Sequence, residues 1–133
     1  MLNTLKGIGV PVTGFRLKDG SGLSLRNRVR PRTIGAILRW GLRADTPAAR
    51  ALRRSLPVAC RAGSLLYQMC ETAAEGNLRG KTALVDGARG MAGWVRGEDG
   101  RRTVYVAIFN RARDESALTS TLNLLGRRLA RFP

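Results

Sequence analysis

Histidine is absent from this sequence of 133 residues, and cysteine occurs only at Cys60 and Cys70. Because structural zinc is usually held by several cysteine or histidine ligands, the composition excludes such a site, and we expect neither a metal nor a cofactor. Catalysis by a Ser/His triad or a Cys/His pair is excluded as well, since both need an imidazole base. A disulfide would form only in an oxidising compartment, and we expect two small buried thiols instead.

Long apolar runs are also missing. No stretch approaches the roughly 18 consecutive apolar residues that a membrane-spanning helix needs. The segment Met1–Lys6 lacks the long apolar core of a signal peptide. We therefore expect the chain as written to be soluble and cytoplasmic. With 44% hydrophobic and only 5% aromatic residues, it suits one domain over residues 1–133, or a portion of a larger one.

Acidic residues are few, at 9 against 24 lysines and arginines, which gives a formal charge of +15. Such a charge ordinarily indicates a polyanionic partner, for example nucleic acid, anionic lipid or an acidic wall polymer. Lysine, however, occurs only at Lys6, Lys18 and Lys81. The arginines are scattered singly and in pairs among alanine, glycine and leucine, which favours a coding bias over a basic binding run. The alternative to a coding bias is that the chain is a small basic module that binds nucleic acid or an anionic wall polymer.

Apolar residues at helical spacing predict the helices. Residues 1–9 are typical of the end of a helix, and a short helix within 63–69 is also expected. One helix begins at Pro31, and a second runs from Pro47, after Asp45-Thr46, to about Ser55. A last helix covers about 114–131. The apolar face of the helix at Pro31 consists of Ile34, Ile37, Leu38 and Leu42, and that of the last helix of Leu118, Leu122, Leu125 and Leu129.

The strands are predicted mainly in the second half. Residues 10–12 and 14–17 read as extended, and three strands follow at 81–85, 91–96 and 103–110. Turn signals at Asp86-Gly87 and Glu98-Asp99-Gly100 separate the three, which favours an antiparallel meander. The last helix can cover one face of that meander, so the sequence predicts an α+β fold.

Two segments carry more polar chemistry than packing requires. The first is the glycine-kinked loop Asp19-Gly20-Ser21-Gly22-Leu23-Ser24-Leu25-Arg26-Asn27, which brings the hydroxyl of Ser24 near the amide of Asn27. The second is Lys81-Thr82-Ala83 at the start of a strand, where the ammonium and hydroxyl groups lie on opposite faces unless the strand is an edge facing a cleft. Taken alone, the first segment is typical of a capped turn, and the second indicates no function.

Together, in this order, the two segments resemble the site of serine penicillin-recognising enzymes, which combines a Ser-x-x-Lys box, a Ser/Asn loop and a Lys-Thr-Gly strand. The longer match is similar to the D-Ala-D-Ala carboxypeptidase/endopeptidase family of the penicillin-binding-protein-4 type, from about Val10 to Asn110. Its further motifs here are Ser55-Leu56-Pro57-Val58-Ala59, Gly76-Asn77-Leu78-Arg79-Gly80-Lys81-Thr82, Ala92-Gly93-Trp94-Val95 and Asp99-Gly100. The resemblance implies a partial transpeptidase-like fold: a meander covered by a C-terminal helix, with an N-terminal loop and helices.

The resemblance also implies residue roles. Ser24 and Asn27 would pass protons during acylation and contact the peptide group of the substrate. Lys81 and Thr82 would bind the terminal carboxylate of a D-Ala-D-Ala stem peptide. The backbone N–H of Leu84 would supply part of an oxyanion hole. Ala83 stands where the family has glycine, and Leu84 stands where a small hydroxylated residue is usual.

The nucleophile box has no counterpart in these residues. Three positions before the lysines stand Asn3, Phe15 and Leu78, so no Ser-x-x-Lys occurs. We therefore expect a fragment or degenerate relative that is inactive alone. Its partners would be a stem peptide or β-lactam if the fold is completed. An unpaired sheet edge would favour self-association or pairing with an N-terminal portion. The resemblance implies a location outside the cytoplasmic membrane.

Overall fold

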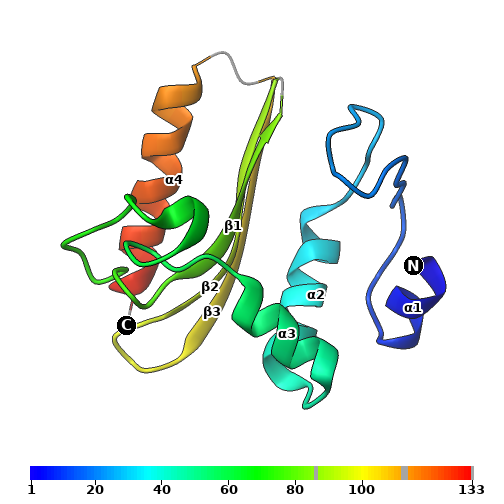
Figure 1. Cartoon of the computed structure of the whole chain (residues 1–133), viewed down its shortest axis with the longest axis horizontal. Coiled ribbons are helices and arrows are strands. Elements are labelled where there is room, and N and C mark those ends of the chain that lie inside the picture. The colour runs from blue at the N-terminus through cyan, green and yellow to red at the C-terminus, as the bar shows by residue number, and fades with distance from the viewer. Residues whose placement is uncertain (86, 112–113, 133) are drawn as a thin grey trace.

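The computed structural model describes residues 1–85, 87–111 and 114–132 and has an α+β architecture in three layers. Helix α4 covers one face of a sheet, and α2 with α3 lies on the other face, beyond which the N-terminal segment runs (Figure 1). The elements in chain order are α1 Leu2–Gly7, α2 Pro31–Arg43, α3 Pro47–Ser55, the 3-10 helix η1 Gly63–Leu65, β1 Arg79–Val85, β2 Ala88–Arg96, β3 Arg102–Asn110 and α4 Glu115–Ala130.

The sheet is the predicted antiparallel meander, in the order β1-β2-β3. Its register pairs Thr82 with Met91 and Met91 with Ala107. At Gly93 the strands approach so closely that an added Cβ would lie 1.9 Å from the carbonyl oxygen of Arg79. Glycine is therefore required there to keep the register that places the residues of β1.

The two predicted turns have different outcomes. Between β2 and β3, the amide of Gly97 donates to the carbonyl of Arg101 at 2.9 Å, and Gly100 donates back to Gly97 at 3.0 Å, which closes the predicted turn. Of the other turn, predicted at Asp86-Gly87, Asp86 lies outside the described residues.

The main core lies between the sheet and α4. Its buried members include Met91 and Val95 from β2 and Leu122 from α4. Gly126 lets α4 pack closely against Met69, because an added Cβ would lie 2.6 Å from the sulfur of that residue. The predicted leucine face of the last helix therefore does cover the meander, and the helix begins after Asp114, whose carboxylate accepts from the amide of Ala117 at 2.9 Å.

A second, smaller core fixes α2 against the opposite face of the sheet. Leu38 and Trp94 are its buried centre, with Ile34 and Val106 packed around them. The buried hydroxyl of Thr33 donates to the carbonyl of Pro11 at 2.7 Å and so ties the N-terminal segment to α2.

The two central helices follow the predictions from Pro31 and Pro47, whereas the flanking segments differ. Helix α1 ends at Gly7, and residues 10–17 form no strand beyond a bridge between Arg16 and Arg28. The helix predicted within 63–69 is reduced to η1. No helix in the described part of the chain is long and apolar enough to cross a membrane.

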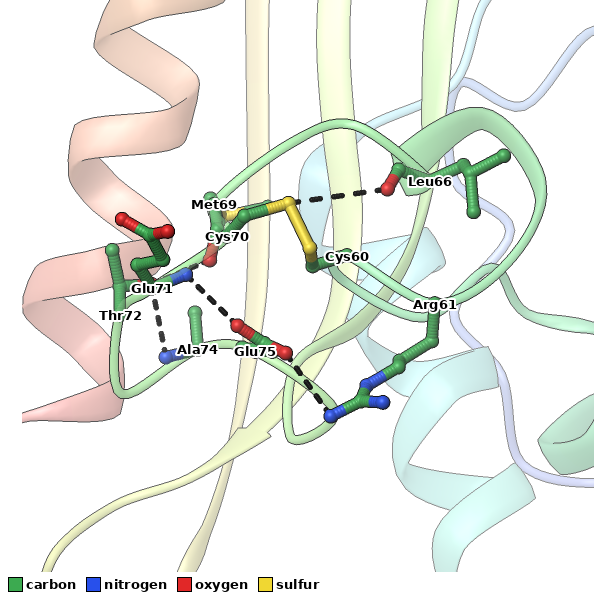
Figure 2. The surroundings of a disulfide bond; sticks show 9 residues. All are labelled: Cys60, Arg61, Leu66, Met69, Cys70, Glu71, Thr72, Ala74 and Glu75. Carbon is green, nitrogen blue, oxygen red and sulfur yellow. Dashed lines mark hydrogen bonds and ion pairs between the residues drawn. A yellow bond between two sulfur atoms is a disulfide. The ribbon is translucent and has the colours of Figure 1, made fainter.

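The prediction of two buried thiols was wrong. Cys60 and Cys70 form a disulfide with 4.9 Å between their Cα atoms (Figure 2). The reason is the path of the loop, which no composition reveals. The amide of Cys60 donates to the carbonyl oxygens of Leu65 and Gln68 at 2.9 and 3.0 Å, so the chain curls back on itself and brings the two sulfurs together.

Candidate functional site

A cavity of about 380 Å³ lies between the loop 19–27 and the face of the sheet that α2 leaves uncovered. Four of the predicted site residues line it, namely Ser24 and Asn27 from the loop and Lys81 and Ala83 from β1. The loop pair and the strand pair are more than fifty positions apart in sequence, and the fold brings them to one place.

Asp19 organises the wall of this cavity. Its carboxylate accepts from the hydroxyl of Ser21 at 2.7 Å, from the side-chain amide of Asn27 at 2.7 Å and from the backbone amide of Ser24 at 3.0 Å. The hydrogen bond from Asn27, followed by that from Ser21, lowers the pKa of Asp19 below its usual value. An ionised carboxylate that accepts several bonds holds a loop in one shape, even where the loop is exposed.

The same network determines what Asn27 and Ser24 have left to offer. The amide nitrogen of Asn27 donates to Asp19, and its oxygen accepts from the backbone amide of Lys18 at 2.8 Å. The hydroxyl oxygen of Ser24 accepts from the amide of Arg26 at 3.2 Å, and its own hydrogen donates to no described group. Asn27 therefore serves first to close the loop, whereas Ser24 retains a donor. Their roles in proton transfer stay predictions.

Strand β1 divides its residues between the two faces. Lys81 and Ala83 line the cavity, whereas the hydroxyl of Thr82 donates to the hydroxyl of Ser64 at 2.9 Å on the side of η1. The ammonium of Lys81 donates to the carbonyl of Thr82. Leu84 follows Thr82 on its face and is 55% exposed. The side chains of Lys81 and Thr82 therefore point to opposite faces of the strand, as alternation requires.

Ala83 has room for its methyl group. In the sheet it pairs with Gly90, which offers no side chain to meet it. The methyl group points into the cavity, so it narrows the space beside the strand without displacing the sheet.

The outer edge of β1 is closed only at its start. Val58 bridges Arg79, and the amide of Gly80 donates to the carbonyl of Pro57 at 3.0 Å. From Lys81 to Val85, β1 pairs with β2 alone in the described chain. Such an edge presents amide and carbonyl groups to which an extended peptide can bind.

The described lining of the cavity is cationic. It includes Lys81, Arg28, Arg89 and Arg111 and no acidic side chain. Arg89 is engaged, because it donates to Glu115 of α4 at 2.5 Å. Arg28 donates to backbone carbonyls of its own loop. The arrangement suits an anionic group held near Lys81, and no cluster of metal-ligating side chains is found among the described residues.

Sequence reasoning missed two contributors to this region, Ser64 and Arg28. Ser64 lies 18 residues before Thr82 in a segment without clear periodicity. Arg28 is one of many scattered arginines. No local signal distinguishes either residue from its neighbours.

Comparison with known proteins identifies the family. The sequence matches the D-Ala-D-Ala carboxypeptidase 3 (S13) family over residues 1–130. The chain belongs to this family. Two curated relatives, both named carboxypeptidases, are consistent with this assignment. The chain is 34% identical to Carboxypeptidase DacB of Mycolicibacterium smegmatis, over 84% of this chain and 25% of that protein. It is also 34% identical to the D-alanyl-D-alanine carboxypeptidase of Actinomadura sp., over 96% of this chain and 24% of that protein.

Solved structures show the same fold. Penicillin binding protein 4 from Haemophilus influenzae superposes with a TM-score of 0.85 and 21% identity, over 98% of this chain and 30% of that one. A second structure of that protein, complexed with a β-lactam, matches equally well. The predicted α+β fold, with its antiparallel meander and C-terminal helix, is therefore confirmed. The chain spans about a quarter of the length of its curated relatives.

Proposed function

We propose that this chain provides a binding surface for the terminal carboxylate of a D-Ala-D-Ala peptide, with Lys81 and Thr82 as the binding residues. The observation that carries the proposal is the position of Lys81, which lines a cationic cavity on a strand whose outer edge, from Lys81 onward, pairs with no other described strand. A peptide laid along that edge gains backbone hydrogen bonds, and its C-terminal carboxylate gains the ammonium group.

The loop 19–27 would form the opposite wall. The bonds that Asp19 accepts fix this wall, and Ser24, whose hydroxyl donates to no described group, lines the same cavity. A donor there suits a peptide carbonyl or carboxylate oxygen of the ligand. The N–H of Leu84 would contribute an oxyanion donor only where an acylating serine is supplied.

We propose binding without covalent chemistry for these residues, because the sequence holds no Ser-x-x-Lys box. The relatives are named carboxypeptidases, and the Haemophilus protein has been solved with a β-lactam. Incubation with a fluorescent penicillin checks this part of the proposal. No covalent label is expected on the chain, and a label that survives denaturation would contradict it.

The proposed location is extracytoplasmic, as is typical of the family. The Cys60–Cys70 disulfide supports it, because disulfides persist in oxidising compartments. Pairing of the free β1 edge with a second copy or with an N-terminal portion remains part of the proposal. Sedimentation at rising concentration tests the first of these partners.

Titration with an acetylated peptide ending in D-Ala-D-Ala tests the binding proposal. Lys81→Ala is expected to weaken binding about tenfold or more, since hydrogen bonds to charged groups contribute roughly 1.5–3 kcal/mol. Lys18→Ala is the matched control, because it removes the same charge from a residue outside the cavity lining. Equal affinity of the two variants would reject Lys81 as the carboxylate ligand.

A second candidate function has one observation in its favour. Arg32, Arg39 and Arg43 lie seven and four residues apart on α2, which places them in one stripe. All three are exposed, line a groove of about 660 Å³ with Trp40, and form no ion pair with a described acidic residue. Such a stripe suits an anionic wall polymer.

Binding to poly(glycerol phosphate) at several salt concentrations tests this candidate. Replacing the three arginines by glutamine is expected to reduce the slope of log affinity against log salt by about 2 to 3. The control replaces the exposed Arg102, Arg127 and Arg128, which removes the same charge elsewhere. Equal slopes for both triple variants would reject the groove, and tighter binding to a thymidine oligonucleotide would identify nucleic acid as the partner.

A further inference from the structure

The hydroxyl of Thr82 is already held by a second hydroxyl. Thr82 Oγ1 and Ser64 Oγ lie 2.9 Å apart, and the bond joins β1 to η1. Thr82 is only half-buried and Ser64 is exposed, so solvent could satisfy either hydroxyl without this bond. The bond fixes the side chain of Thr82 at the start of the free strand edge.

Ser64 lies inside the loop that the Cys60–Cys70 disulfide closes. The residue after it, Leu65, is fully buried in the main core, as is Met69 near the other end of the loop. The side-chain amide of Gln68 donates to the carbonyl of Ser64 at 2.9 Å. Ser64 is therefore held by the buried residue next to it and by Gln68 rather than carried on a free tip.

The backbone of this loop would not hold its shape by itself. Cys60 and Met69 within the loop, and Glu71 directly after it, have positive φ angles of 54°, 58° and 57°. Residues with a Cβ atom pay about 1 kcal/mol or more in this region, so neighbouring contacts must maintain the conformation. The disulfide is one such contact (Figure 2). Another is Glu75, which accepts from the amide of Glu71 at 2.8 Å and pairs with Arg61 at 3.0 Å.

The hydrogen bond between Ser64 and Thr82 joins two hydroxyl groups, and this allows either of them to be the donor. Each hydroxyl can donate one hydrogen and accept others, so the direction of the bond can reverse by rotation of the two hydrogens. When an anion approaches Thr82, Ser64 can donate to Thr82 while Thr82 donates to the anion. A chain of hydrogen bonds of this kind polarises its members and strengthens the terminal bond.

We infer that Ser64, fixed in the disulfide-closed loop, is a positioning residue that orients and polarises the Thr82 hydroxyl for a peptide carboxylate. The inference rests on the proposed function, because it assigns a support to one of the two proposed carboxylate ligands. It adds a residue outside the resemblance motifs and gives the disulfide a role in binding.

Titrations with two ligands test the inference. The first is an acetylated D-Ala-D-Ala peptide, and the second is its C-terminal amide, which lacks the carboxylate. Ser64→Ala is expected to weaken binding of the acid by roughly two- to tenfold, the size of one hydrogen bond, and to leave the amide unchanged. Ser64→Thr, which keeps the hydroxyl, should restore the affinity. Joint replacement of Cys60 and Cys70 by serine should weaken binding of the acid peptide by a similar factor.

Several results would overturn the inference. The first is that Ser64→Ala binds the acid peptide as tightly as the wild type does, and the second is that Ser64→Thr fails to restore the affinity for the acid. The third is that Ser64→Ala weakens binding of the acid and of the amide equally. The fourth is that the variant without the disulfide binds the acid with full affinity. If the wild type binds neither ligand, the proposed function fails. The side-chain coupling constants of Thr82 then decide the positioning claim: one rotamer is expected in the wild type and an average in Ser64→Ala, and no difference would refute it.

Discussion

Asn27 donates its side-chain amide to the carboxylate of Asp19, eight positions earlier, at 2.7 Å, and so closes the loop that forms one wall of the cavity. This bond is also the largest cause of the lowered pKa of Asp19. The resemblance assigned Asn27 to the substrate, whereas its first partner in the fold is the loop itself. The loop is therefore built around an ionised aspartate.

The pH dependence of the loop follows from this pair. Because the fold lowers the pKa of Asp19 below its usual 3.8, the network is complete above that pH and is lost as the pH falls through the lowered value. We expect the backbone amide resonances of Gly22 and Ser24, both hydrogen-bonded to Asp19, to shift as the pH falls, with a midpoint below the usual value of 3.8.

Asp19→Asn is the control for this titration. It removes the charge and should abolish the shift, leaving Ser24 and Gly22 with altered resonances at neutral pH. A midpoint at or above the usual value of 3.8 in the wild type would show that the bonds to Asn27 and Ser21 do not stabilise the carboxylate.

Close packing of β1 against β2 predicts a strong effect of Gly93→Ala. The added Cβ would lie 1.9 Å from Arg79 O and 2.6 Å from Gly80 Cα, so backbone must move. We expect a loss of about 1–3 kcal/mol in the free energy of unfolding, measured by urea denaturation. Gly7→Ala is the control, because nothing lies within 4 Å of its added Cβ. Equal midpoints for both variants would contradict the register at Arg79.

The Cys60–Cys70 disulfide is expected to stabilise the chain. For a loop with a sequence separation of 10, the chain-entropy relation gives about 3 kcal/mol. Replacing both cysteines by serine should lower the urea midpoint accordingly, whereas a reducing agent should change the variant little. An unchanged midpoint would mean that buried Leu65 and Met69 hold the loop without the covalent link.

The sequence predicted regular elements well because their signals are local. The apolar spacing after Pro31 and Pro47 and the turn around Asp99 each depend on neighbouring residues, and the corresponding elements were found within a few residues. The three strands begin earlier than predicted: β1 by two positions, β2 by three and β3 by one. Pairing with a neighbouring strand extends each of them beyond its apolar alternation.

Features that depend on contacts across the chain could not be predicted. The disulfide forms because an irregular loop curls on itself, and that loop offers no periodicity. The bond between Ser64 and Thr82 joins a 3-10 helix to a strand, and neither residue indicates the other. The resemblance assigned the loop 19–27 and the strand with Lys81 to one site, but the cavity between them and the closure of its wall by Asp19 depend on the fold.

The most direct measurement is an NMR titration of the isotope-labelled chain with an acetylated peptide ending in D-Ala-D-Ala. We expect shifts in the amides of Lys81–Val85 and of Gly22–Asn27, which flank the cavity, and loss of the strand shifts in Lys81→Ala. Shifts confined to the arginine stripe of α2, or identical shifts in the wild type and Lys81→Ala, would contradict carboxylate binding at this strand.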